Sequence, residues 1–157
     1  HFRSLGHSHV DTFLNSGNVI FQSRSRNIVS LSASLERALE PLLGLRSEAF
    51  VRPEKEVDAI AEQALALSKA HPPPQEVNVA FLTKPLESSA LTELSALTTT
   101  TDSCLPRGTE VYWLCAVKQS ESVFSNGVFE RKTKVRTTFR RATMLHGLSS
   151  HLSDKGG

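Results

Sequence analysis

The sequence predicts an α+β protein built from two small ferredoxin-like halves with antiparallel sheets. The length, 157 residues, suits one large or two small domains. Strand-like and helix-like segments alternate along the chain, which is typical of α+β layers. Three consecutive prolines at residues 72–74 can lie neither inside a helix nor in a central strand. We therefore expect a first half at residues 1–70, a Pro-rich linker at 71–76 and a second half at 77–157.

Composition excludes several classes of protein. A hydrophobic content of 39% and a charged content of 22% are ordinary for globular domains, which argues against disorder and fibrous structure. The longest apolar runs are a few residues, so we expect no membrane association. Two cysteines exclude a disulfide-rich scaffold, and no basic segment followed by an apolar stretch marks an export signal. The expected location is the cytoplasm.

The first half begins with a hairpin pattern. Residues 1–5 resemble the end of a helix that stops at Gly6. Two strand-like runs follow at residues 10–14 and 19–22, and the turn-forming residues 15–18 connect them. The sequence therefore predicts two antiparallel strands here.

Two amphipathic helices complete the first half. Apolar residues recur at three- and four-residue steps over residues 27–43, and Gly44 is the expected end of this helix. A strand is expected at residues 48–52. Pro53 suits a helix start, and the apolar stripe of the second helix runs through Val57, Ile60, Ala64 and Leu67.

The second half shows a similar alternation. Expected strands lie at residues 77–82 and 111–117, with a turn at Arg107 and Gly108 and a further strand-like run around Cys104. Expected helices cover residues 86–97, 122–132 and 138–152. The ferredoxin-like βαββαβ order fits the first half if one more strand precedes His1. We therefore predict that residues 1–70 do not fold stably alone.

The segment at residues 12–21 contains Ser16-Gly17-Asn18 followed by Val19, an aliphatic residue and Phe21. This pattern resembles the hairpin of the bacterial domain of unknown function 1697 family. Residues 49–52, the strand at 77–82 with Pro85, and residues 108–112 are also similar to that family. The resemblance covers nearly the whole chain.

The resemblance implies a fold more than a function, because the family name carries no activity. The family's opening strand and a Gly-Gly loop would precede His1. Near the C-terminus, Arg140, Thr143 and Leu145 match the family's pattern.

The turn Ser16-Gly17-Asn18 is the first candidate site. Its backbone N–H groups and short polar side chains could form an anion-binding nest. A tight hairpin turn explains the same residues through the φ angles that Gly17 and Asn18 tolerate.

A basic C-terminal segment is the second candidate. From Lys118 onward there are eight Lys and Arg against three Asp and Glu, a local charge of +5, whereas the preceding residues hold ten against thirteen, a charge of −3. The cations concerned are Arg131, Lys132, Lys134, Arg136, Arg140 and Arg141. The total of +2 therefore conceals an acidic body and a basic end.

Two geometries could make this segment a site. In one continuous helix, Lys132, Arg136 and Arg140 would share a face. If a new helix begins just before Arg140, then Arg140 and Arg141 lie in its first turn, where a bound phosphate or carboxylate would offset their repulsion from the helix dipole. The alternative is a solvated basic face paired with acids of the first half, such as Glu54, Glu56 and Asp58.

Other reactive residues have ordinary explanations. His7 and His9 near Asp11 could contribute to a metal site, but surface histidines explain them and we expect no metal. Cys104 and Cys115 could pair across a hairpin or remain buried thiols. Phosphate-loop, dinucleotide and zinc-protease motifs are missing from the sequence, so no cofactor is expected.

Two functions are compatible with these observations. The first is a non-catalytic module that binds an anionic small molecule, a nucleotide or an acidic protein through Lys132, Arg136, Arg140 and Arg141. Nucleic acid has less support because no aromatic residues alternate with the basic ones. The second is an enzyme of unknown reaction whose site lies between the halves near Ser16-Gly17-Asn18.

Overall fold

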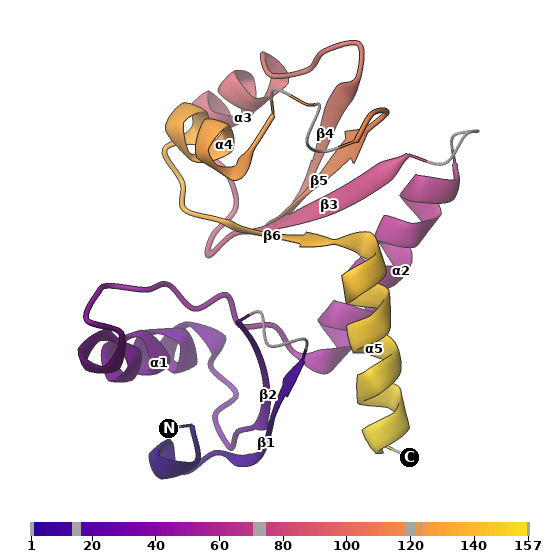
Figure 1. Ribbon diagram of the computed structural model, residues 1–157. Helices are drawn as coiled ribbons and strands as arrows, with labels where there is room; N and C mark the ends of the chain where they lie inside the picture. The colour runs from indigo at the N-terminus through magenta and orange to yellow at the C-terminus, as the bar shows by residue number, and fades with distance from the viewer. Residues whose placement is uncertain (1, 14–16, 71–74, 119–121, 123, 157) are drawn as a thin grey trace. The chain divides into compact units, whose positions relative to one another are not determined.

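A computed structural model describes residues 2–13, 17–70, 75–118, 122 and 124–156. It divides the chain into two compact units, His1–Val51 and Arg52–Gly157, here called the first and second units (Figure 1). This division precedes the expected linker at 71–76, so the helix that follows Pro53 belongs to the second unit. Residues 71–74 themselves lie outside the described part of the chain.

The first unit contains the expected hairpin. A short 3-10 helix, η1 (Arg3–Leu5), ends at Gly6, whose φ of 86° places it in the left-handed region that glycine tolerates. Strands β1 (Ser8–Phe13) and β2 (Asn18–Gln22) then pair antiparallel and form a two-stranded sheet. The antiparallel pairing predicted from two strand-like runs joined by turn-forming residues is confirmed.

Helix α1 (Ile28–Leu43) follows in the first unit, with both expected boundaries. The Asn27 side chain accepts a hydrogen bond from the Ser30 N–H at 3.0 Å, which caps the first turn. The expected strand at 48–52 is wrong, because this segment forms no ladder. The Ala49 N–H donates instead to the Glu36 carboxylate at 2.9 Å, which attaches the segment to α1.

The second unit contains four helices and a four-stranded sheet in its described residues. In chain order they are α2 (Glu54–Lys69), β3 (Glu76–Phe81), α3 (Ser88–Ser95), β4 (Asp102–Arg107), β5 (Glu110–Cys115), α4 (Asn126–Thr133), β6 (Thr138–Arg141) and α5 (Ala142–Gly156). The spatial order of the strands is β4-β5-β3-β6, and every neighbouring pair is antiparallel. The α+β class with antiparallel sheets is therefore confirmed.

Helices cover both faces of this sheet, since α3 and α4 lie on one side and the packed pair α2 and α5 on the other (Figure 1). The core on the α3 and α4 side comprises Ala80, Leu82, Leu94, Val111, Trp113, Cys115, Phe124 and Phe129. Alternating residues such as Val79 and Tyr112 point to the opposite face and are equally buried. No helix in the described residues is long and apolar enough to cross a membrane.

The helix predicted at residues 138–152 begins later in the structure than expected. Residues 138–141 form β6, which pairs with β3 through Phe81↔Thr138 and Asn78↔Arg141, and α5 begins at Ala142. Phe139 packs beside Trp113 at 5.9 Å between ring centroids, so this apolar residue belongs to the sheet core rather than to a helical stripe. The helix expected from residue 122 begins at Asn126 as α4, capped by the Ser125 hydroxyl.

Candidate functional site

Both ends of the four-stranded sheet hold largely buried charge: an Arg52–Glu110 ion pair at one end and the Asp102 carboxylate at the other. At one end, the register places Arg107, Glu110, Phe81 and Thr138 in a single row across the four strands. We call this the Arg52 end, because the Arg52 guanidinium lies over the Phe81 ring, 5.4 Å from its centroid. At the opposite end, Asp102 is paired with Cys115 and Cys115 with Glu76. We call this the Asp102 end.

Arg52 connects three segments at its end of the sheet. Its Nη2 donates to the Leu82 carbonyl at 2.6 Å, to the Thr109 carbonyl at 3.0 Å and to Glu110 Oε2 at 3.2 Å. The Arg52 and Glu110 side chains are only 10% and 13% exposed, so the ion pair is largely removed from water. The arginine therefore neutralises the one carboxylate of the row and fixes the β4–β5 turn to the end of β3.

Further hydrogen bonds strengthen the contact between β3 and the β4–β5 turn and attach the loop between α4 and β6 at the Arg52 end. The Leu82 N–H donates to the Thr109 carbonyl at 2.9 Å, which continues the sheet beyond β3. The Thr137 hydroxyl donates to the Phe81 carbonyl at 2.8 Å, and the Thr137 N–H donates to the Glu130 carboxylate at 3.0 Å. The loop between α4 and β6 is therefore held against the end of β3.

The basic segment does not continue one helix. Lys132 is exposed in the last turn of α4, and the chain leaves that helix at Lys134, whose φ is 59°. Arg136 is exposed in the following loop. The shared helical face expected for Lys132, Arg136 and Arg140 is therefore wrong.

Arg140 and Arg141 lie on strand β6 rather than in the first turn of a helix. Successive strand residues point to opposite faces, so the two guanidinium groups diverge. Arg140, opposite Val79, is half-buried, and its Nη1 donates to the Thr138 hydroxyl at 2.6 Å and to the Phe139 carbonyl at 2.8 Å. Burial lowers the pKa of the Arg140 guanidinium. Arg141, opposite Asn78, is exposed.

The Asp102 end is a hydrogen-bonded carboxylate site. Oδ1 of Asp102, 3% exposed, accepts from Trp113 Nε1 at 2.7 Å and from the Ser122 hydroxyl at 2.8 Å, and Oδ2 accepts from the Thr101 hydroxyl at 2.9 Å. Burial opposes ionisation of this carboxyl, but the hydrogen bonds from Trp113, Ser122 and Thr101 outweigh burial and lower its pKa. The carboxylate is ionised at neutral pH and its oxygens are occupied.

Cys115 is a buried free thiol and Cys104 a half-buried one. The expectation of unpaired thiols is therefore confirmed, and the alternative of a disulfide between them is wrong. The ladder places Cys104 opposite Trp113 and Cys115 opposite Asp102. Burial, with a smaller contribution from the Asp102 charge, raises the pKa of Cys104 to about 12. Burial also raises the pKa of Cys115, whose thiol donates to the Val117 carbonyl. Neither thiol supplies a nucleophilic thiolate at neutral pH.

The turn candidate is only partly described. Gly17 has a φ of 83°, and Asn18 begins β2 opposite Phe13, which agrees with the turn interpretation of these residues. Ser16 lies outside the described residues. The enzyme hypothesis that depends on Ser16-Gly17-Asn18 therefore stays a prediction.

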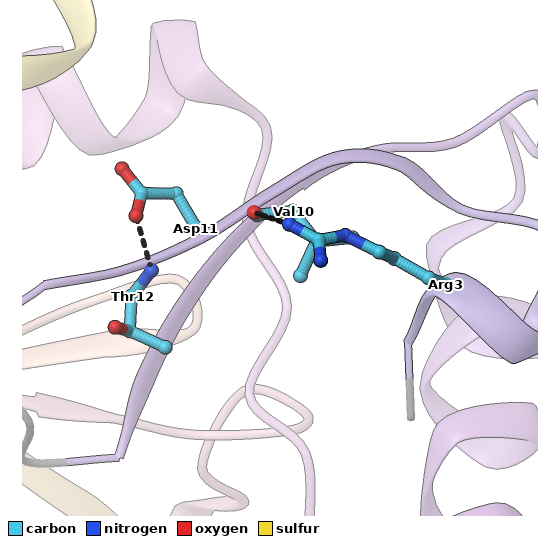
Figure 2. Close-up of a pocket in the computed structure, with 4 residues that line it drawn as sticks. All are labelled: Arg3, Val10, Asp11 and Thr12. Carbon is cyan, nitrogen blue, oxygen red and sulfur yellow. Dashed lines mark hydrogen bonds between the residues drawn. The ribbon is translucent and has the colours of Figure 1, made fainter.

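A shallow depression of about 310 Å³ lies beside β1 in the first unit, lined by Arg3, Val10, Asp11 and Thr12 (Figure 2). Arg3 Nη2 donates to the Val10 carbonyl at 3.2 Å, and Asp11 Oδ1 accepts from the Thr12 N–H at 2.9 Å. Figure 2 shows the Asp11 carboxylate pointing away from the Arg3 guanidinium. The two charged groups thus do not converge on one ligand position.

The histidine pair is not assembled as a metal site. His7 packs against Phe21 with ring centroids 4.8 Å apart, and His9 has a φ of 50° where the β1–β2 register is irregular. Within the ranges that the structure describes, no group of three or more His, Cys, Asp or Glu is arranged to hold a metal ion.

Comparison with known proteins identifies the family. The sequence pattern of the family described as Protein of unknown function (DUF1697) matches residues 1–112. The chain belongs to this family. The match ends within β5, so the basic segment on α4 and β6 lies beyond the matched residues of this DUF1697 protein. No curated protein and no solved structure matches the chain.

Sequence reasoning missed the two buried charges that organise the sheet ends. Asp102 follows a run of threonines that reads as a loop, and Arg52 ends a segment that reads as a strand. No sequence pattern distinguishes Asp102 from an exposed loop residue, because Asp is rarely buried in folded proteins. The partners of Arg52 are carbonyls at Leu82 and Thr109, which no sequence pattern identifies.

Proposed function

We propose that this DUF1697 protein is a non-catalytic binding module whose basic segment, residues 131–141, contacts an anionic ligand. The segment contains six Lys and Arg and no Asp or Glu. Five of the six cations are exposed: Arg131, Lys132, Lys134, Arg136 and Arg141. This concentration of exposed positive charge is the observation that carries the proposal.

The helix dipole explains the positions of only some of these exposed cations. Arg131 and Lys132 lie in the last turn of α4, where the negative end of the helix dipole favours cations without any ligand. Arg136 and Arg141 lie beyond that helix, in the loop and at the end of β6. Both side chains are exposed, and in this proposal they contribute to the attraction of an anion, whether an anionic small molecule, a nucleotide or an acidic protein.

The polar groups with shifted pKa values favour binding over catalysis. Asp102 is engaged by neutral donors, and the pKa values of Cys104 and Cys115 are raised away from neutrality. A general base or nucleophile needs a pKa near the working pH and access to substrate. The proposal therefore includes no reaction and no cofactor.

The test is a titration with sodium tripolyphosphate and, in parallel, a fluorescein-labelled poly-glutamate peptide. We expect both to bind at about 50 mM salt and to weaken strongly at about 300 mM, because exposed charges are screened. The double variant Lys132→Ala, Arg136→Ala should bind about fivefold more weakly, since each exposed charge pair contributes up to about 1 kcal/mol.

A matched control removes the same charge elsewhere in the second unit. Lys55 and Lys69 are exposed on α2, so Lys55→Ala, Lys69→Ala has the same net charge as the test variant. Equal weakening by both double variants would show only a net-charge effect and would contradict a site at residues 131–141.

We also propose that the second unit follows the ferredoxin-like plan expected for that half. The elements β3-α3-β4-β5-α4-β6 have the βαββαβ order, and the sheet order β4-β5-β3-β6 supports this assignment. Helices α2 and α5 are additions to that plan. Nuclear Overhauser contacts between β3 and both β5 and β6 would test it, and a β3–β4 pairing would contradict it.

A further inference from the structure

Four exposed cations lie on three segments that come together at the Arg52 end of the sheet. Arg107 ends β4, Lys84 follows β3, and Lys134 and Arg136 precede β6. These segments lie at the same end of the sheet because of the row Arg107–Glu110–Phe81–Thr138 and the hydrogen bond from the Thr137 hydroxyl to the Phe81 carbonyl. We call Lys84, Arg107, Lys134 and Arg136 the basic rim. Two of its members, Lys84 and Arg107, lie far from the basic segment in sequence.

The nearby carboxylates do not cancel this charge. Glu110 is paired with Arg52 and also accepts a short hydrogen bond from the Thr109 hydroxyl. Glu130 accepts from the Thr137 N–H, a neutral donor, so this carboxylate keeps its charge and offsets one of the four cations. In the segments that meet here, residues 82–87, 107–110 and 134–138, Glu87 is the exposed acid, at the start of α3. The rim is therefore a net positive surface on a fixed scaffold.

The span of the rim sets the size of its ligand. Arg107 ends β4, and Arg136 lies in the loop two residues before β6 begins at Thr138; these two outer strands are three strand spacings or about 14 Å apart. One phosphate or carboxylate cannot contact both. In an extended peptide, side chains on one face recur about every 6.7 Å, so three alternate acidic residues extend over about 13 Å.

Resting on the proposed anion-binding function, we infer that the ligand is an extended acidic peptide of a protein partner, with alternate Asp or Glu side chains on the basic rim. A nucleic-acid strand fits less well, because strand binding relies on bases stacking on exposed aromatic rings. Trp113 and Tyr112 are buried, and no aromatic side chain is among the exposed large hydrophobic residues of the described chain. The rim supplies charge without a stacking surface.

The experiment compares two fluorescein-labelled peptides of the same composition by anisotropy at low salt. One alternates Glu with Thr, and the other places its three Glu residues together. The alternating peptide should bind more tightly to the full chain. The double variant Lys84→Ala, Arg107→Ala should bind it about fivefold more weakly, because two exposed charge pairs are lost.

Two controls isolate the effect of the rim. Lys55→Ala, Lys69→Ala removes two exposed cations from α2 and should leave the affinity for the alternating peptide within about twofold of wild type. Thermal melting of both double variants should match wild type, because all four side chains are exposed.

The outcomes separate this inference from the proposed function. If Lys132→Ala, Arg136→Ala weakens binding but Lys84→Ala, Arg107→Ala does not, the basic segment binds anions and the rim is overturned. If neither peptide nor tripolyphosphate binds at low salt, the proposed function fails as well. Tighter binding of a labelled oligothymidine than of the alternating peptide would overturn the peptide as ligand.

Discussion

The two ends of the same sheet hold a buried charge in opposite ways. Arg52 is surrounded by the carbonyls of Leu82 and Thr109, the Glu110 carboxylate and the Phe81 ring, so an opposite charge contributes to its neutralisation. Asp102 receives hydrogen bonds from neutral indole and hydroxyl donors. A buried ion is tolerated in either environment, because both replace the water it has lost.

This difference has a functional consequence. At the Arg52 end, Glu110 is paired with Arg52, so this carboxylate does not neutralise the exposed cations of the basic rim. At the Asp102 end, the hydrogen bonds are directed inward and satisfy the carboxylate. The first arrangement fits the proposed anion binding, and the second fixes the Ser122 side chain.

The largest expected effect is at Asp102. Asp102→Ala leaves the Trp113 N–H and the Ser122 hydroxyl without their acceptor, and Trp113 is fully buried. We expect a loss of about 3 kcal/mol in the free energy of unfolding, as for other buried polar networks. Urea denaturation followed by tryptophan fluorescence measures this directly.

An exposed acid provides the control for Asp102. Glu93 is exposed on α3, so Glu93→Ala should change the free energy of unfolding by less than about 0.5 kcal/mol. A loss below about 1 kcal/mol for Asp102→Ala would show that the hydrogen-bonded carboxylate does not organise its end of the sheet.

The next largest effect is at Arg52. Arg52→Ala removes three hydrogen bonds and leaves Glu110 without its partner, so we expect a loss of about 2 kcal/mol in the free energy of unfolding. Solvent reaches both side chains, which keeps the loss below that of a fully buried pair. In a double-mutant cycle with Glu110→Ala, a coupling energy near zero would mean that the ion pair contributes nothing.

Much of the fold could be predicted from local pattern. Helix α1 was expected with both boundaries, because Asn27 and Gly44 are effective end signals and its apolar stripe is regular. Strand β6 was missed because Phe139 and Leu145 fit a helical period, while only pairing with β3 makes residues 138–141 extended. Strand pairing is a tertiary interaction that local periodicity does not contain.

The candidate site was predictable in composition but not in geometry. The run of cations from Arg131 to Arg141 is visible in the sequence, whereas the divergence of Arg140 and Arg141 depends on their being in a strand. Sheet register places Arg107 at the Arg52 end, and Lys84 reaches the same end because it lies three residues after β3. A site assembled from loops at one end of a sheet therefore requires the topology.

A smaller effect is the pH dependence that Asp102 contributes. Its pKa in the folded protein is below the ordinary 3.8, so the folded state binds this proton less readily than the unfolded chain. The resulting stabilisation is present in full well above pH 3.8 and is lost as pH falls through the lowered pKa. The difference in free energy of unfolding between wild type and Asp102→Asn should therefore shrink in acid. Other carboxyl groups titrate in both proteins and cancel, so a difference that grew below pH 3.8 would contradict a lowered pKa.

The smallest effect concerns Cys104, close to the same carboxylate. Burial and the Asp102 charge raise the pKa of this thiol to about 12, so its reaction with iodoacetamide at neutral pH should be slow in the folded protein. Asp102→Asn removes the electrostatic contribution but not the burial, and we expect labelling to accelerate only about threefold. Peptide mapping by mass spectrometry separates Cys104 from Cys115. An unchanged labelling rate would mean that burial alone raises the pKa of Cys104 and that the Asp102 charge has no effect on this thiol.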